Sequence, residues 1–182
     1  MEILPYEKVK AEFKPWTETY LAVAHALIRF IETDEIEVMH FGSTSARVGG
    51  KGIIDLSVLY PEGQLQAAVD HLKALGFQDQ ASAKPFPPER PRKDGAVLFE
   101  GRKYLIHAHV IQKHSEEHQR QRAYRDYLLA NPQVRADYER QKKAILAEGV
   151  DDQDAYVKRK APFVKTILQI GRASCRERVF PV

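Results

Sequence analysis

The chain has 182 residues, the length of a single domain, and its 43% hydrophobic and 29% charged residues exclude a disordered or fibrous protein. Its one cysteine excludes a disulfide framework, and no apolar run reaches the roughly 20 residues that cross a membrane. The N-terminus lacks the apolar segment of a secretory signal, so we expect a cytoplasmic protein with no membrane partner. The formal net charge is +3.

The first half of the chain predicts two helices and two strands. Apolar residues at helical spacing in residues 15–31 predict an amphipathic helix. Residues 36–41 form a short β-prone run, and the nearly all-apolar residues 53–60 predict a buried strand. Leu65, Val69, Leu72 and Leu75 at helical spacing predict a second helix, and Gly76 suits the left-handed position that ends it.

The second half predicts a hairpin and then a group of helices. Four prolines in residues 84–95 argue against a regular element there. Residues 96–99 and 103–112 predict two strands joined by a turn that contains Gly101. Three helices follow, with boundaries at Ser115, Asn131-Pro132, Gly149 and Asp151. This order predicts an α+β fold, in which a small mixed β-sheet has flanking helices and a C-terminal helical bundle.

The end of the chain has a different origin in our interpretation. Residues 170–180, IGRASCRERVF, resemble the in-frame translation of a common sequencing adapter, so we interpret residues 170–182 as a non-native tail. The alternative is a genuine basic C-terminus. From Gly171 onward the chain carries three arginines and one glutamate, a net charge of +2, which leaves +1 for the remainder. This nearly neutral balance predicts no nucleic-acid partner.

A glycine-rich loop between the two predicted strands carries the residues with the clearest chemistry. Gly42 allows a backbone to approach a ligand closely, while Ser43, Thr44 and Lys51 suit phosphate oxygens. Asp55 opens a buried strand, where a carboxylate is costly unless it is paired or bound to a cation. A carboxylate opposite phosphate donors holds a divalent cation and a polyphosphate together, so we expect Asp55 to bind Mg²⁺ or Mn²⁺.

Two histidines are candidates for the same site. His107 and His109 are two residues apart on one predicted strand, so their side chains share a face. Opposite Asp55 they would serve as metal ligands, substrate contacts or a general base. The alternative is that they are half-buried histidines bonded to the backbone. His40, which precedes the Gly-Ser turn, is a weaker candidate.

Basic residues cluster in the proline-rich segment and the hairpin: Lys84, Arg90, Arg92, Lys93, Arg102 and Lys103. One interpretation is a basic lid over a phosphorylated ligand. The other is a set of solvated loop charges.

The motif spacing resembles that of the nucleotidyltransferase superfamily, which is marked by apolar-Gly-Ser, about a dozen residues, and then Asp-apolar-acid-apolar. Here Phe41-Gly42-Ser43 precedes eleven residues and then Asp55-Leu56-Ser57-Val58. More narrowly, the chain resembles the GrpB family, which also occurs fused to dephospho-CoA kinase. The matching segments are HFGSTS, GKGIIDL, HAHV and two helical segments at residues 125–142 and 151–164.

The resemblance implies a nucleotidyltransferase-like core in residues 1–114, with the helical residues 115–169 packed on the same core. It places the two histidines where the superfamily has a third acid. Ser57 stands in place of the second carboxylate, so the two-acid metal cradle is incomplete and Ser57 becomes a candidate substrate contact. The segment Ala46-Arg47-Val48-Gly49 stands where relatives tend to have Val-Pro-Gly-Leu. Its Arg47 either meets a substrate anion or is a solvated loop charge.

Two functions follow from these observations. The first is metal-dependent nucleotidyl transfer from a nucleoside triphosphate to an unknown small acceptor, with a nucleotide or phosphorylated small molecule as ligand. The alternative is a catalytically degenerate module that binds a nucleotide or a CoA-related molecule. Ser57 and the fusion to dephospho-CoA kinase in relatives favour this alternative.

Overall fold

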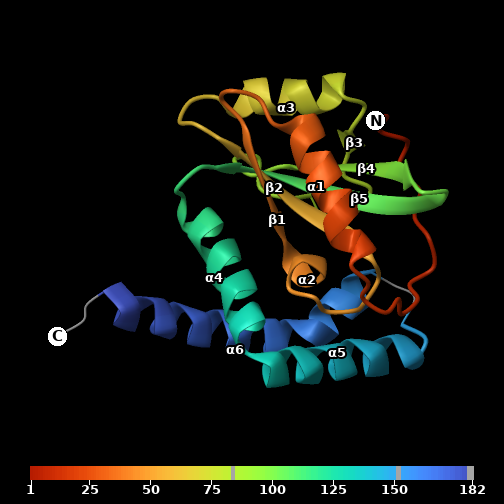
Figure 1. Cartoon of the computed structure of the whole chain (residues 1–182), viewed down its shortest axis with the longest axis vertical. Helices are drawn as coiled ribbons and strands as arrows, with labels where there is room; N and C mark the ends of the chain where they lie inside the picture. The colour runs from red at the N-terminus through yellow and green to blue at the C-terminus, as the bar shows by residue number, and fades with distance from the viewer. Residues whose placement is uncertain (83–84, 151–152, 180–182) are drawn as a thin grey trace.

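A computed structural model of the chain describes residues 1–82, 85–150 and 153–179. A five-stranded sheet lies at its centre, with the strand order β1-β2-β5-β4-β3 (Figure 1). The strands are β1 (Glu37–Phe41), β2 (Ile53–Tyr60), β3 (Gln78–Asp79), β4 (Arg92–Phe99) and β5 (Arg102–Gln112). β2 and β5 are parallel, and every other neighbouring pair is antiparallel. The predicted mixed sheet and α+β class are confirmed.

Helices surround the sheet unevenly. They are α1 (Thr19–Ile31), α2 (Gly42–Ser45), α3 (Leu65–Ala74), α4 (Glu116–Ala130), α5 (Pro132–Ala147) and α6 (Gln153–Val179). α1 and α3 pack on the sheet, whereas α4, α5 and α6 gather at the end where the short α2 lies (Figure 1). No helix in the described part of the chain is both long enough and apolar enough to cross a membrane.

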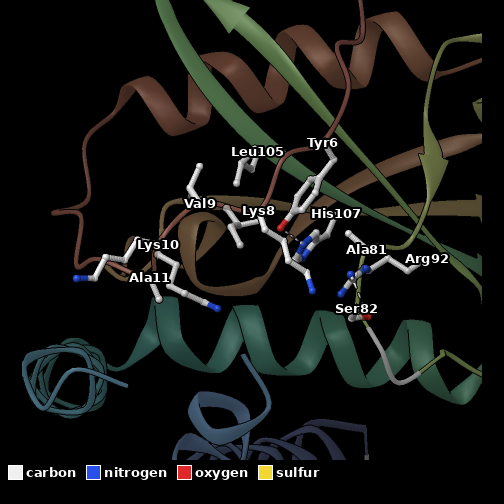
Figure 2. A pocket seen from close by; sticks show the side chains of 12 residues that line it. Tyr6, Lys8, Val9, Lys10, Ala11, Ala81, Ser82, Arg92, Leu105 and His107 are labelled. Carbon is white, nitrogen blue, oxygen red and sulfur yellow. Dashed lines mark hydrogen bonds between the residues drawn. The ribbon is translucent and has the colours of Figure 1, made fainter. Parts of the chain in front are cut away.

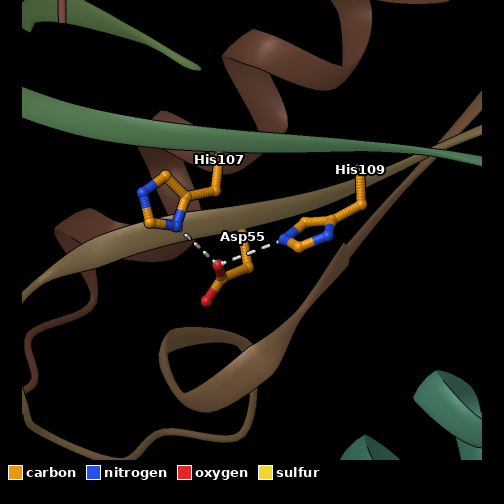
Figure 3. A group of neighbouring side chains, drawn as sticks. All are labelled: Asp55, His107 and His109. Atoms are coloured by element: carbon orange, nitrogen blue, oxygen red, sulfur yellow. Dashed lines mark ion pairs between the residues drawn. The ribbon is translucent and has the colours of Figure 1, made fainter. Parts of the chain in front are cut away.

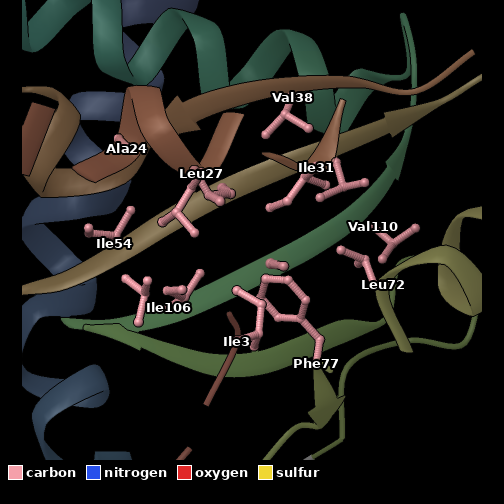
Figure 4. Packing of buried hydrophobic residues seen from close by; sticks show 14 of the residues in the cluster. Ile3, Ala24, Leu27, Ile31, Val38, Ile54, Leu72, Phe77, Ile106 and Val110 are labelled. Atoms are coloured by element: carbon pink, nitrogen blue, oxygen red, sulfur yellow. The ribbon is translucent and has the colours of Figure 1, made fainter. Parts of the chain in front are cut away.

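The main hydrophobic core lies between one face of the sheet and the helices α1 and α3. Side chains alternate across a strand, so every second residue of β2 and β5 faces this core. Fully buried members of the core are Ile54, Leu56, Val58, Ile106, Ala108 and Val110 from the sheet, with Val23, Leu27, Ile31 and Leu72 from the helices (Figure 4). The intervening residues of the same strands face the opposite way.

A second, smaller core joins the C-terminal helices to the glycine-rich loop. Tyr124, Leu128, Tyr138 and Ile167 pack against each other, and the loop contributes Ala46 and Val48. On the far side of the loop, the backbone N–H of Gly49 donates to the Glu139 carboxylate at 2.7 Å. The helices therefore fix the position of the loop.

Several predicted boundaries are confirmed. Ser115 caps α4 by accepting a hydrogen bond from the His118 N–H at 3.3 Å, and Pro132 opens α5. The hairpin between β4 and β5 has a two-residue turn, in which Glu100 (φ 49°) and Gly101 (φ 75°) both take the left-handed conformation. The predicted cap at Asp151 lies outside the described residues.

Two predictions about local structure are wrong. The segment at residues 92–95 belongs to β4 rather than to an irregular loop, because Arg92 and Asp94 neutralise each other at 2.7 Å and can be buried together. The Gly-Ser loop begins as the helical turn α2. The two-residue strand β3 was not predicted, since so short a strand has no sequence periodicity.

Candidate functional site

The second face of the sheet is polar at its centre. Register pairs Asp55 with His107 and Ser57 with His109 across β2 and β5, so all four side chains lie on this face. The predicted proximity of Asp55 to the two histidines is confirmed. β4 continues the polar face, since it pairs Asp94 with His107.

The two imidazoles converge on one carboxylate oxygen (Figure 3). Asp55 Oδ1 lies 3.4 Å from His107 Nδ1 and 3.9 Å from His109 Nε2. One ligand atom from each of the three residues falls within 4.8 Å of the others. Two imidazole nitrogens and one carboxylate suit first-row transition cations such as Mn²⁺, Fe²⁺ or Zn²⁺. Mg²⁺ prefers oxygen ligands, so the set fits it less well.

The protonation states suit cation binding. Burial by itself would raise the pKa of Asp55, but hydrogen bonds from His107 and His109, together with their positive charge at the low pH where Asp55 titrates, outweigh burial and hold that pKa well below its ordinary value. Burial lowers the pKa of His107, which is 7% exposed. At neutral pH Asp55 is therefore an anion and His107 is neutral, the states in which both residues ligate metals.

Position 42 requires a glycine, because the backbone there lies against the Asp55 carboxylate. Its φ is 74°, and a Cβ there would lie 2.5 Å from Asp55 Oδ2. The glycine predicted to admit a ligand therefore admits the Asp55 carboxylate.

His40 and Thr44 form a separate pair. The Thr44 hydroxyl bonds the His40 Nε2 at 2.9 Å, and both side chains are buried. Burial lowers the pKa of His40 to about 4, so the ring is neutral. The Thr44 hydroxyl is thus used inside the protein, and the prediction that Thr44 meets phosphate stays a prediction. His40 pairs with Leu56 rather than Asp55 in the register, so its side chain points to the other face of the sheet.

Ser57 and Arg47 do not line the space beside Asp55, and the exposure of Arg47 agrees with its second interpretation, a solvated loop charge. Ser57 is fully buried, and its hydroxyl donates to the Gln121 side-chain oxygen of α4, so it does not face a ligand. Arg47 stacks near Trp16 and lines a separate surface hollow with Arg135 and Lys143. Neither residue lies where it would contact a molecule bound at Asp55.

A cleft of about 510 Å³ opens beside Asp55, between the sheet and the C-terminal helices. The sheet side supplies Phe41, Gly42, Ser43, Asp55 and His109, and the helical side includes Arg120, Gln121, Tyr124, Tyr138, Val157 and Lys160. Its lining is mostly apolar and aromatic with a few charges, as in small-molecule sites. The prediction that Ser43 faces a ligand stays open, since Ser43 does line the cleft.

Sequence reasoning missed the helical half of this cleft. Tyr124 and Tyr138 belong to aromatic stripes that predict a core, and they are indeed core residues as well as cleft residues. Arg120 and Lys160 have no distinguishing motif. Nothing local in the sequence shows that their helices fold back over Asp55.

The predicted basic lid is only partly present. Arg90 lines the cleft, where it pairs with Glu117 at 2.9 Å. Arg92 and Lys93 are instead buried in β4, paired with Asp94 and Asp79. Arg102 and Lys103 are at the exposed hairpin end and do not contribute, and Lys84 lies outside the described residues.

A family model described as GrpB protein matches residues 8–170. The chain belongs to the GrpB family. This GrpB protein is 26% identical over 170 residues to UPF0157 protein YqkA of Bacillus subtilis (strain 168), a match that covers 88% of this chain and 47% of YqkA. It is 27% identical over 165 residues to UPF0157 protein SCO7215 of Streptomyces coelicolor, covering 88% and 82%. The chain thus spans about half the length of YqkA.

Solved structures with similarity to this GrpB protein include two polymerases. Cid1 poly(U) polymerase aligns with a TM-score of 0.49 at 14% identity, over 74% of this chain and 41% of the polymerase. Leishmania infantum polymerase beta aligns with a TM-score of 0.42 at 12% identity, over 76% and 54% of the two chains. The predicted family is confirmed by the family model, while the reaction and its ligands are matters of proposal.

Proposed function

We propose that this GrpB protein transfers a nucleotidyl group from a nucleoside triphosphate to a small acceptor, using a divalent cation. The observation that carries the proposal is the Asp55–His107–His109 cluster at the wall of a cleft of nucleotide size. The Gly-Ser and Asp motif, which resembles that of nucleotidyltransferases, supports it.

Each part of the cleft has a role in this proposal. Asp55, His107 and His109 would hold the cation, which supplies charge neutralisation at phosphate oxygens. Ser43 lies beside Asp55 and donates a hydroxyl to phosphate. On the helical side, Lys160 supplies positive charge.

The base of the nucleotide would occupy the aromatic part of the cleft. Phe41 and Phe86 each make an edge-to-face contact with His109, with ring centroids 5.2 and 5.1 Å apart, and both line the cleft. Tyr138 lines the opposite side. Aromatic faces bind any base by stacking.

The reaction is a substitution at phosphorus. The acceptor's hydroxyl oxygen forms a bond to the α-phosphorus, the bond from that phosphorus to the bridging oxygen breaks, and pyrophosphate leaves with that oxygen. The acceptor's proton passes to solvent water. Positioning of the two reactants by the cleft supplies most of the acceleration.

Calorimetric titration with ATP, GTP, CTP and UTP tests the proposal, each with Mn²⁺, with Mg²⁺ and without a cation. We expect cation-dependent binding of at least one nucleotide, stronger with Mn²⁺ than with Mg²⁺, and its loss in Asp55→Asn. Asp70→Asn is the matched control, because Asp70 lies exposed on α3. Equal binding by Asp55→Asn and the parent would overturn the proposal.

A second candidate function is nucleotide binding without catalysis. It is favoured by Ser57, which stands where the superfamily has a second carboxylate and is buried against Gln121. The metal cluster then contains one carboxylate, that of Asp55, and two imidazoles. Release of pyrophosphate in the presence of bound nucleotide and acceptor separates the two functions, because a binding module releases none.

A further inference from the structure

We propose that a second cavity, on the far side of His107 from the nucleotide cleft, binds a small anionic molecule that serves as the acceptor. The anionic group would be a carboxylate or a phosphate ester. The assignment of an acceptor role rests on the proposed function, whereas anion binding can be tested without it.

The cavity is small and separate from the cleft. Its volume is about 200 Å³, and it lies between the N-terminal segment and the open side of β2 and β5 (Figure 2). The N-terminal segment contributes Tyr6, Lys8, Val9, Lys10 and Ala11, and the rest of the lining includes Lys51, Ser82, Arg92 and His107. This volume suits a small metabolite and is less than half that of the cleft.

The lining has an excess of positive charge. Lys8, Lys10, Lys51 and Arg92 surround the cavity, and among the described residues no carboxylate lines it. Arg92 is neutralised by Asp94 through two hydrogen bonds of 2.7 and 2.9 Å, so the excess comes from Lys8 and Lys10. Such a lining favours an anion.

His107 is shared between the cavity and the metal cluster. Its Nδ1 faces Asp55 at 3.4 Å, and its Nε2 faces the Tyr6 hydroxyl at 3.3 Å (Figure 2). In the tautomer whose Nδ1–H donates to the carboxylate, Nε2 accepts from the Tyr6 hydroxyl. A molecule seated beside Tyr6 is therefore one side chain away from Asp55.

This arrangement assigns opposite sides of the cluster to the two substrates. The cleft contacts the cluster through Asp55 and His109, and the second cavity contacts it through His107. An acceptor held by its anionic end near Lys8 would present a hydroxyl toward the α-phosphorus. That oxygen then makes the bond to phosphorus described above, and pyrophosphate leaves on the cleft side.

Chemical-shift titration by NMR tests anion binding without cation or nucleotide. The probes are methyl phosphate and acetate, with methanol as an uncharged control. We expect one or both anions to shift the amides of Tyr6, Ala11 and Ser82, and methanol to shift none. The double variant Lys8→Gln/Lys10→Gln should bind the effective anion about tenfold more weakly, from the loss of two charge contacts.

The matched control is Lys73→Gln/Lys158→Gln, which removes two exposed lysines that do not line the cavity. It should bind the anion as the parent does. Lys8 and Lys10 are exposed, so the test variant should keep the parent's thermal midpoint. No shift with either anion, or equal affinity in Lys8→Gln/Lys10→Gln and the parent, would overturn the proposal.

The two proposals fail separately. In Asp55→Asn, the nucleotide site is lost while the lysines remain, so methyl phosphate or acetate should still bind with the parent's affinity. Loss of anion binding in that variant would place the anion at Asp55 and overturn the second site.

Discussion

The two faces of the central sheet are built from the same strands yet serve opposite purposes. On one face, Ile54, Leu56 and Val58 of β2 are fully buried beneath α1 and α3. On the other, Asp55 carries a charge and remains 24% exposed at the edge of a cleft. Alternation along a strand thus places a closed hydrophobic core one residue away from a polar site.

The polar face tolerates its charges because each one has a partner. Arg92 with Asp94 is neutralised as a buried ion pair, and Asp55 is held by two imidazoles. Buried charges are stable only when paired and hydrogen-bonded. The apolar face needs no such partners, because its side chains are stabilised by burial alone.

Truncating a side chain in the core of the apolar face should have the largest effect on stability. We expect Leu56→Ala to lower the free energy of unfolding by about 3 kcal/mol, because it leaves a cavity where relaxation is limited. Urea denaturation measures the change. Leu98→Ala is the control, since Leu98 is 60% exposed and should cost at most about 0.5 kcal/mol. Equal losses in the two variants would contradict the assignment of the core.

A substitution at Gly42 on the polar face should lower the free energy of unfolding by less, and should weaken cation binding more. Gly42→Ala introduces a Cβ against Asp55 Oδ2 at a positive φ, so we expect a loss of about 2 kcal/mol and at least a roughly tenfold weaker affinity for Mn²⁺. Gly63→Ala is the control: Gly63 has a φ of 81° and no atom within 4 Å of the added Cβ.

Gly63→Ala should show the backbone strain alone, about 1 kcal/mol, with unchanged affinity for Mn²⁺. Calorimetry and urea denaturation give both quantities. If the two variants lose the same amount of stability and both bind Mn²⁺ normally, the contact between Gly42 and Asp55 has no role in the site.

The pH dependence of stability should report the difference that is most specific to one side chain. Burial lowers the pKa of Lys142 to about 7 and Lys160 adds to the effect, while Asp55 and Glu139 oppose it and Lys51 reinforces it. The unfolded chain keeps the ordinary, higher pKa and binds more protons between pH 7 and about 10. Stability should therefore rise with pH across this window, by up to about 1.4 kcal/mol per pH unit.

Lys142→Met should flatten this slope and stabilise the protein at pH 7. Lys143→Met is the control, because Lys143 is the exposed neighbour on the same helix and should leave the slope unchanged. Urea denaturation at pH 7, 8 and 9 measures the slopes. A parent whose stability is constant over this range would show that Lys142 is charged in the folded protein.

Helices and strands with a periodic pattern of apolar residues could be predicted from the sequence. Contacts between residues far apart in the chain could not. β2, β5 and the shared face of His107 and His109 follow from alternation and composition. The pairing of β2 with β5 is not local, so the contact with Asp55 rested on the family resemblance. The motif position of Ser57 predicted a ligand contact. Its actual partner, Gln121, is 64 residues away in the chain, so nothing in the local sequence indicated this hydrogen bond.

Buried charges were the other source of error. Arg92 and Asp94 are typical of a loop in sequence, and only their mutual contact explains a strand there. Lys142 is 2% exposed although its helix has a largely polar sequence. In both cases a compensating partner or neighbouring ring, invisible in the local pattern, decided the outcome.

The parallel pairing of β2 with β5 also determines when the Asp55 cluster can exist during folding. The aligned residues Asp55 and His107 are separated in the chain by a helix, a short strand and a whole hairpin strand. Such distant contacts form slowly, because a long loop must close before any contact is gained. A cation held by the cluster would bind only after this closure, and its binding free energy would add to that of folding. Removal of the cation should therefore speed the separation of β5 from β2 before it affects the β4–β5 hairpin.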